Sequence, residues 1–425
     1  MSVTRSTTFI ALTNGNYRWL FAGNLAMFFS IASRMMLTNL LAWQLTKDET
    51  SLAFINFALA IPMFIGALIA GAIVDRLERR KLIILGLIVV LIGESSVLIA
   101  LLLNHLTYTH LLVATFIGGS AHPFIMPAST TVMFGLLGKS QMANGVALMS
   151  GAMNLSRILG PAITGIVAAF AGADIAFFIV VALSFIALCC QWQLPQSFPT
   201  LEKTVSISED ILIGFRYLFQ SKIILLCLLY GLIPILLAMS VQYFLVVLAD
   251  KIWMAGANGL GILLAAMGVG GIVGSLIVAR VGERYSRSKM LLVSSVCCAL
   301  FFGLFGASDS FWLAVVLLGV ANMFTIISQV VNQVSIQLLV DEKVRGRVSG
   351  YVLMSFSLGP LAVIPLAYFI QLIGPKLAII SAAGLTIVLS IFFYWVSSNI
   401  RNIDRQISVV VTSDSPITDK PVLKG

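Results

Sequence analysis

Long apolar segments recur along the whole chain, and this pattern constrains the fold more than any other feature. A helix needs about 20 apolar residues to cross the hydrocarbon core of a bilayer. Windows of that length place twelve spans, at residues 19–43, 53–74, 82–103, 110–136, 143–170, 174–194, 223–248, 258–279, 290–307, 311–339, 348–373 and 376–398. Open strands would leave backbone groups unpaired in lipid. We therefore predict an all-α membrane protein with twelve transmembrane helices.

The composition excludes a set of soluble domains. Hydrophobic residues make up 59% of the chain and charged residues only 10%, whereas soluble domains carry about 25% charged residues. The net charge of +9 does not indicate a nucleic-acid partner, because the basic residues lie in short loops between apolar segments. The five cysteines lie inside apolar segments, and no cluster of histidine, cysteine and carboxylate side chains appears. We expect no cofactor and no metal.

The distribution of lysine and arginine predicts the orientation in the membrane. Twenty-one basic residues fall on the side that holds both termini, and only Lys47, Lys251 and Lys376 fall on the opposite side. Loops rich in lysine and arginine stay in the cytoplasm. We therefore expect a multi-pass protein of the cell (inner) membrane with both termini in the cytoplasm. The remaining two, Arg34 and Arg157, lie within spans.

The longest loop divides the chain into two halves. Residues 1–194 form a predicted N-terminal six-helix half, and residues 223–400 a C-terminal six-helix half. Between them, residues 195–222 read as a cytoplasmic linker with an amphipathic helix, while the polar segment 401–425 reads as a disordered tail. A faint repeat relates segments that begin at Gly71 and Ser275, 204 residues apart. Two parallel six-span halves are typical of one large transporter architecture.

Several motifs carry a resemblance to a known family. The segment Gly71-x-x-x-Asp75-Arg76-x-x-Arg79-Arg80 resembles the cytoplasmic loop motif of the major facilitator superfamily. In span 5, Ser156-x-x-x-Gly160-Pro161 is similar to the superfamily's antiporter motif. Other segments, including Asn16-Tyr-Arg18 before span 1, look like the efflux branch that includes macrolide exporters and the enterobactin exporter. The resemblance covers about residues 16–398 and implies a transporter of two six-helix halves.

The motifs predict moving parts. Gly71, Asp75, Arg76, Arg79 and Arg80 lie at the ends of two helices, where charge pairs can lock one conformation and release another. Plain positive-inside anchoring is the alternative, and we favour it for Arg79 and Arg80.

Gly160 and Pro161 occur together in the middle of span 5. Proline removes a backbone hydrogen bond and glycine removes a side chain, which permits a hinge. Ordinary packing of small residues is the alternative.

Three charges lie deep in spans. Glu94 is the only acid near the midplane, and Arg34 and Arg157 lie at a similar depth. Buried membrane charges are costly and are usually paired or functional. Glu94 is therefore a candidate for proton coupling, and a structural pair with one of the arginines is the alternative. His122 is a weaker candidate. Two arginines against one glutamate favour an anionic or electron-rich substrate.

Polar side chains on membrane helices predict a substrate cavity. Asn322, Thr325, Gln329 and Gln333 recur at helical spacing on one face of span 10, which lipid would penalise. By resemblance, spans 1, 4, 7 and 10 line the cavity, which adds the weaker candidates Asn24, Tyr230 and Gln242. Hydrogen bonding between helices is the alternative reading of the stripe.

Together these observations predict a secondary active transporter rather than an enzyme, because no H-E-x-x-H or G-x-S-x-G motif and no pair of buried acids occurs. We expect proton-coupled antiport that exports a small amphipathic compound, either a drug (as in drug resistance) or a siderophore-like anion. Import of a small organic solute by the same fold is the alternative. The transporter is expected to act as a monomer in the bilayer, with a small-molecule substrate and protons as its partners.

Overall fold

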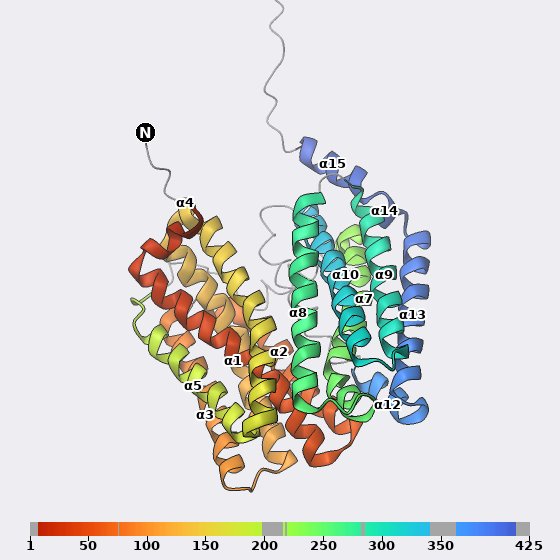
Figure 1. Ribbon diagram of the computed structural model, residues 1–425. Helices are drawn as coiled ribbons and strands as arrows, with labels where there is room; N and C mark the ends of the chain where they lie inside the picture. Colours follow the sequence, from red (N-terminus) through yellow and green to blue (C-terminus); the bar gives the residue numbers. More distant parts are fainter. Residues whose placement is uncertain are drawn as a thin grey trace, which may run out of the picture.

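Two bundles of helices stand side by side in the computed structural model (Figure 1). The structure describes residues 7–74, 76–197, 216, 219–281, 285–340 and 363–413, and throughout this part of the chain all regular structure is helical. Eleven of these helical segments are long and apolar enough to cross a membrane. The prediction of an all-α membrane protein is confirmed.

The N-terminal bundle begins with a short surface helix and continues with long membrane helices. Its elements are η1 (Thr7–Thr13), α1 (Gly15–Thr46), α2 (Glu49–Val74), α3 (Arg79–Leu102), α4 (Tyr108–Ala171) and α5 (Ala173–Trp192).

The C-terminal bundle is built from a second set of long helices with short helices after it. Its elements are α7 (Lys222–Lys251), α8 (Gly256–Val281), α9 (Arg287–Ala307), α10 (Phe311–Leu339), α12 (Val363–Ile373), α13 (Pro375–Val396), α14 (Ser398–Arg401) and α15 (Ile403–Ser413).

Helix α4 contains two predicted spans joined by a sharp kink. Its backbone leaves helical geometry only at Gly138, where φ is +63° and ψ is −178°. A positive φ of this kind favours glycine because a side chain would clash with the backbone. The two arms, Tyr108–Gly138 and Asn144–Ala171, are each long enough to span a bilayer. Gly138 therefore replaces the expected loop between spans 4 and 5.

The described helices match the predicted spans to within a few residues. Two predicted segments cannot be compared in full. Most of the predicted linker helix and most of span 11 lie outside the described residues, so that α12 is the described end of span 11. The expectation of disorder from residue 401 is wrong for residues 403–413, which form α15. The side chains of Ile403 and Ile407 are buried against the C-terminal bundle, and this contact orders a segment that is mostly polar.

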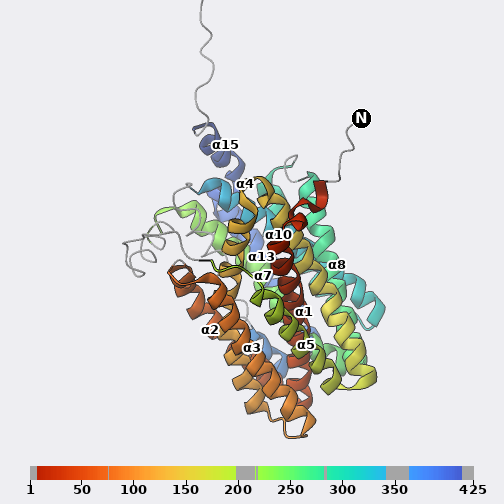
Figure 2. The same ribbon diagram turned by 90° about the vertical axis from the view of Figure 1, so that its left-hand side faces the viewer.

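The two faces of the molecule differ in how the bundles meet. The start of α1 and helix α15 lie at the same end, called here the terminal face, and the opposite end is called the distal face (Figures 1 and 2). One buried cluster packs within the N-terminal bundle and another within the C-terminal bundle. A third cluster joins α1, α2 and α4 to α7, α8 and α10. The bundles are thus joined by a shared core toward the distal face.

Candidate functional site in the membrane core

Arg34 and Glu94 form an ion pair inside the N-terminal bundle. Arg34 Nε on α1 lies 3.4 Å from Glu94 Oε1 on α3, and the two side chains are 11% and 3% exposed. Burial of either charge alone would be costly, so each stabilises the other. The structure therefore selects Arg34, and not Arg157, as the partner of Glu94.

His122 extends this pair onto α4. Its Nδ1 lies 2.7 Å from the carbonyl oxygen of Gly118, and its Nε2 lies 3.3 Å from Arg34 Nη2. The carbonyl can only accept, and the guanidinium can only donate. His122 is thus a neutral imidazole that donates from Nδ1 and accepts at Nε2. Gly118 leaves space for the arginine, because an added Cβ would lie 2.5 Å from Arg34 Nη1.

Serine hydroxyls complete the surroundings of Glu94. Ser30 Oγ on α1 donates to Glu94 Oε1 at 3.3 Å and lies 2.7 Å from Ser184 Oγ on α5. Both serines are buried. Side chains from α1, α3, α4 and α5 therefore converge on one buried, titratable group, which we call the charge cluster: Ser30, Arg34, Glu94, His122 and Ser184.

Arg157 lies elsewhere, on an exposed face of the second arm of α4. Within the described residues its side chain has no hydrogen bond or ion pair, and Asn154, one turn before it, is only partly buried. Three residues later, Gly160 packs against α1, where an added Cβ would lie 3.0 Å from Ala32 Cβ. The backbone of α4 stays helical at Gly160 and Pro161, so this conformation shows close packing there. Their role as a hinge stays a prediction.

Helices α4 and α8 cross tightly between the two bundles. A Cβ added at Gly261 would lie 2.7 Å from the carbonyl oxygen of Pro161, and one added at Gly165 would lie 2.9 Å from that of Ala257. Only glycine permits backbones to approach this closely. The crossing joins the bundles on the distal side of Arg157.

The predicted stripe on α10 divides between two environments. Thr325 is buried and lies 3.1 Å from Cys298 Sγ on α9, and Asn322 Nδ2 donates to the carbonyl oxygen of Met267 on α8 at 2.6 Å. These two bind neighbouring helices in this conformation, and the role of the stripe in a substrate cavity stays a prediction. Asn322 and Gln329 are partly exposed and Gln333 is exposed, so the stripe is most open at its end toward the terminal face.

The weaker cavity candidates are mostly buried within single bundles. Asn24 is 4% exposed, and it donates to Ser129 Oγ at 2.7 Å and accepts from Gln191 Nε2 at 3.1 Å. Tyr230 is fully buried in the core of the C-terminal bundle. Both are enclosed by protein in this conformation, whereas Gln242 is partly exposed, and the assignment of all three to a substrate cavity stays a prediction.

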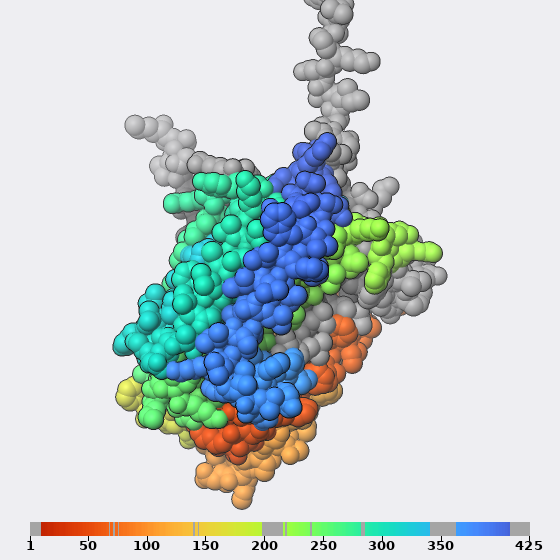
Figure 3. Space-filling view, turned by 90° about the vertical axis from the view of Figure 1, so that its right-hand side faces the viewer, coloured from red at the N-terminus to blue at the C-terminus, as the bar shows by residue number. Residues whose placement is uncertain are grey.

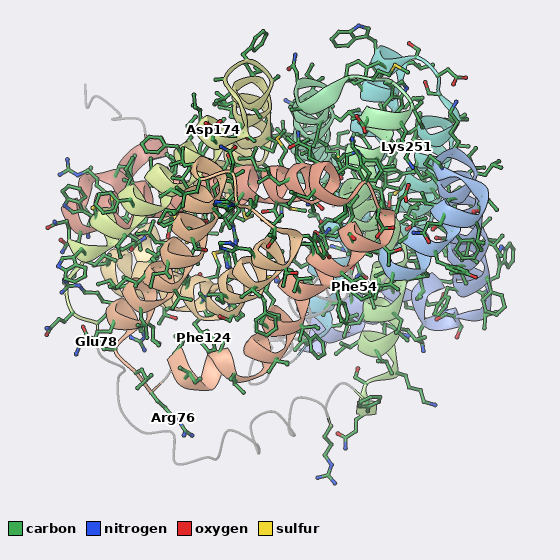
Figure 4. All side chains as sticks on the ribbon, turned by 90° about the horizontal axis from the view of Figure 1, so that it is seen from below. Phe54, Arg76, Glu78, Phe124, Asp174 and Lys251 are labelled. Carbon is green, nitrogen blue, oxygen red and sulfur yellow. The ribbon has the colours of Figure 1, made fainter. Side chains whose placement is uncertain are left out.

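A polar network that the sequence analysis missed closes the distal face. Asp250 Oδ2 at the end of α7 accepts from Trp43 Nε1 and from Lys47 Nζ, both at 2.7 Å. Lys251 Nζ donates to Glu49 Oε1 at 2.6 Å. Lys47 and Lys251 both lie over the Trp43 ring, 5.3 Å and 5.2 Å from its centroid. Figure 4 shows Lys251 where the two bundles meet.

A second set of contacts extends this closure to α12. Gln371 Nε2 donates to Asp48 Oδ1 at 3.0 Å and to Thr50 Oγ1 at 2.7 Å. In Figure 3, α12 rests against the red N-terminal helices at the distal end. The sequence did hold a signal for this closure, because Lys47 and Lys251 are 204 residues apart, the spacing of the internal repeat.

The loop motif between α2 and α3 is only partly visible. Asp75 lies outside the described residues, and Gly71 lies within α2. Arg76 is exposed and projects away from the bundle (Figure 4). Arg79 and Arg80 bind the end of α5 and the segment after it, through Arg79 N to the Ser197 carbonyl at 3.0 Å and Arg80 Nη2 to the Trp192 carbonyl at 2.6 Å. The latch therefore stays a prediction.

The sequence and the fold are similar to those of known transporters. An enterobactin exporter, EntS, from Shigella boydii serotype 18 is 28% identical over 293 residues, which cover 68% of this chain and 69% of that protein. The EntS of Shigella boydii serotype 4 is 27% identical over 334 residues, covering 77% and 79% of the two chains. The crystal structure of the nucleoside transporter NupG matches 89% of this chain and 98% of that one, with a TM-score of 0.72 and 16% identity.

This structural likeness shows the fold of major facilitator transporters and not that of an enzyme. The family model described as a transmembrane secretion effector matches residues 6–407, nearly the whole chain. The predicted superfamily is thereby confirmed. The chain belongs to the transmembrane secretion effector family of the major facilitator superfamily, and it is a multi-pass membrane transporter.

Proposed function

We propose that this transporter is a secondary active exporter of the cell (inner) membrane that works by alternating access. The observation that carries the proposal is the asymmetry between the two faces. Ion pairs and a tight helix crossing close the distal face, whereas Gln333 on α10 and Arg157 on α4 are exposed nearer the terminal face. The excess of lysine and arginine assigns the terminal face to the cytoplasm. The conformation then corresponds to a carrier that is open to the cytoplasm.

The direction of transport rests on the relatives. Two bacterial relatives that align over 68% and 77% of this chain are named as exporters. We infer that a small amphipathic compound enters from the cytoplasm and leaves after the distal network opens. A siderophore-like anion is the favoured cargo, and a drug is the other class that the proposal includes.

We infer that the charge cluster couples export to protons. Glu94 is the only acid deep in a span, and its one charged partner within the described residues is Arg34. Protonation of Glu94 would neutralise its carboxylate, so that Arg34 would lose its counter-charge and keep only its contact with His122. A conformational change that exposes Glu94 to one side at a time would then exchange a proton for substrate. A purely structural pair would leave transport insensitive to the proton gradient.

Transport into everted membrane vesicles tests direction and coupling together. Vesicles that contain the protein should accumulate enterobactin, the compound named in the relatives, when an inward-acid proton gradient is imposed. Collapse of the gradient should stop the accumulation. The variant Glu94→Gln should lose gradient-driven uptake but retain exchange down a concentration gradient, because the side chain keeps its shape and no longer titrates.

Three outcomes would change the proposal. Gradient-driven uptake only by right-side-out vesicles would indicate an importer. Full uptake by the Glu94→Gln variant would leave Glu94 as a structural partner of Arg34. A lack of enterobactin transport in both orientations would exclude that compound as cargo.

The loop motif adds a proposed latch. Asp75→Asn removes one charge at the end of α2 with little change in volume, and should reduce transport severalfold while membrane insertion is unchanged. Normal transport by this variant would reduce the motif to an orientation signal.

A further inference from the structure

Arg157 lies on a polar, exposed face of the second arm of α4. Ser150 is seven residues and Asn154 three residues before it, so the three side chains share one side of the helix. Ser150 and Arg157 are exposed, and Asn154 is partly exposed. A Cβ added at the neighbouring Gly151 would meet nothing within 4 Å. This face of α4 is therefore open in the described conformation.

The face that Arg157 occupies is not the lipid face. Apart from Val146 at the start of the arm, the large apolar side chains exposed on the same arm lie on the opposite side of the helix: Leu155, Leu159, Ile163, Ile166 and Phe170. A helix in this position can expose two opposite faces only if one meets lipid and the other meets water or protein. The polar face thus borders the space between the bundles.

Arg157 sits at the inner end of that space. It is in the middle of the span Asn144–Ala171, and about 13 residues of helix place it about 20 Å from the start of the span. This distance is too long for its side chain to reach the membrane surface. Just beyond it, Ile158 packs against Gly268 of α8, and the crossing at Gly261 follows. On this face of α4, Arg157 is thus the last exposed side chain before the crossing with α8.

The charge of Arg157 has no counter-charge at this depth. Glu94, the only acid deep in any span, is already bound to Arg34. Within the described residues Arg157 forms no ion pair. A lone positive charge in a water-filled pocket with low-dielectric walls attracts anions and repels cations.

We propose that Arg157 is the residue that selects the cargo, and that it binds the negative group of a small organic anion at the inner end of the cavity. This inference rests on the proposed transport function and deepens it by naming the substrate class. Asn154 and Ser150 lie within reach of polar groups on the same molecule, and Gln329 and Gln333 belong to the partly open face of α10. A planar guanidinium favours carboxylate, sulfonate or phenolate oxygens through paired hydrogen bonds.

The charge at this position can be measured directly with thiol reagents. A single cysteine, Asn154→Cys, would be placed in a background that lacks the five native cysteines. Two methanethiosulfonate reagents would then be compared, one bearing a sulfonate and the other a trimethylammonium group. The ratio of their reaction rates reports the local potential. Arg157→Gln should lower the anion-to-cation ratio about tenfold, and Arg157→Lys should largely preserve it.

Two controls separate this effect from general changes. Arg18→Gln removes an exposed charge near the start of α1 and should leave the ratio unchanged. The organic anion 8-anilinonaphthalene-1-sulfonate should protect the cysteine in the presence of Arg157, whereas its neutral analogue N-phenyl-1-naphthylamine should not.

The outcomes distinguish this inference from the proposed function. An unreactive thiol in the Asn154→Cys variant, a rate ratio that ignores Arg157, or equal protection by the two naphthyl compounds would each overturn the anion site. These reaction rates can be measured whether or not the protein transports a substrate. If the vesicle experiments fail while the ratio changes as expected, the export proposal is wrong and the anion site stands.

Discussion

At the scale of single residues, two membrane arginines of similar depth have opposite surroundings. Arg34 is buried against a carboxylate and an imidazole, whereas Arg157 is exposed and unpaired within the described residues. Sequence reasoning found both arginines and Glu94 because charges stand out in apolar segments. It could not pair them, because the partner is decided by the rotation of α1, α3 and α4 about their axes, which composition does not encode.

The buried pair predicts that a single variant is much less stable than the double variant. Arg34→Gln leaves Glu94 buried without its counter-charge, so we expect a loss of about 3–5 kcal/mol in the free energy of unfolding. The double variant Arg34→Gln and Glu94→Gln should recover most of that loss. Unfolding of the purified protein in mixed micelles with increasing denaturing detergent would measure both. Equal destabilisation by the single and double variants would contradict the pairing.

Asp48 predicts a pH dependence of the distal closure. Partial burial raises the pKa of Asp48, but hydrogen bonds from Ser51 and Thr50 lower it, and the net pKa lies below its ordinary value. Ser51 and Thr50 follow Asp48 in the same bundle and keep these bonds when the bundles separate. The link to closure therefore rests on Gln371 of α12, which donates to the anion only while the distal face is closed. This contribution is complete above an ordinary pKa of about 3.9 and is lost as the pH falls through the lowered pKa.

Spin labels on the distal ends of the two bundles, at Gln44→Cys and Met254→Cys, would measure this effect as a change in distance distribution. We expect no change in the closed population between pH 7 and pH 5 and a decrease below about pH 4. Asp48→Asn should make that decrease smaller, and the ion pairs of the distal network account for the remainder. A decrease of the same size in the variant would assign the pH sensitivity to those pairs alone.

At the scale of elements, the close approach of the α4 and α8 backbones adds to the side-chain core that joins the bundles. Gly261→Val would place side-chain carbons against the Pro161 carbonyl, which is 2.7 Å from the position of an added Cβ. Since neither backbone can shift far in a packed helix pair, the variant should insert normally but lose at least tenfold in transport rate. Gly384→Val is the matched control, because an added Cβ there meets nothing within 4 Å.

Helix α15 is anchored by one carboxylate at the start of α9. Asp404 Oδ1 accepts from the backbone of Arg287 at 3.1 Å, and Asp404 Oδ2 accepts from Ser286 Oγ at 2.7 Å. Asp404→Ala should cost about 1 kcal/mol, as loss of a helix cap does, and should speed proteolysis of the tail. Arg405→Ala, an exposed neighbour, should have no effect. An unchanged cleavage rate in Asp404→Ala would show that Ile403 and Ile407 hold the helix alone.

The extent of α15 shows what hydropathy leaves out. The long helices were predicted to within a few residues because a bilayer demands long apolar segments. A short amphipathic helix at the surface has no such requirement, since it is ordered by a few buried contacts. Ile403 and Ile407 supply them here. Their burial depends on the C-terminal bundle and was therefore not visible in the polar composition of residues 401–425.

At the scale of the whole molecule, ion pairs across the bundles predict how far the distal face stays closed. Asp250→Asn removes the charge that binds Lys47 Nζ at 2.7 Å. Exposed pairs contribute about 0.2–1 kcal/mol, so the ratio of closed to open molecules should fall up to about fivefold. The spin-label distances described above would report the shift. Lys376→Met breaks a pair with Asp309 within the C-terminal bundle and should leave the ratio unchanged.

The surroundings of the polar side chains were harder to predict than the fold. The α10 stripe was found from its spacing, yet Thr325 and Asn322 bind neighbouring helices, because a polar face on a membrane helix can be satisfied by protein as well as by water. The distal network was missed because its members were counted only as orientation signals. Each lysine on that side is in fact bound to an acid: Lys47 to Asp250, Lys251 to Glu49 and Lys376 to Asp309.

The pairing of Arg34 with Glu94 also bears on how the chain is made. A nascent polypeptide leaves the ribosome from its N-terminus, so Arg34 reaches the translocon before Glu94 does. The carboxylate therefore finds its counter-ion already in place as it enters the bilayer. Arg157 is synthesised later, and the preceding spans offer it no unpaired acid. Helix α8, which completes the surroundings of Arg157, is synthesised about 100 residues afterwards. Biogenesis of the first bundle can thus satisfy its buried ion pair at once, whereas Arg157 acquires its final environment only when the second bundle arrives.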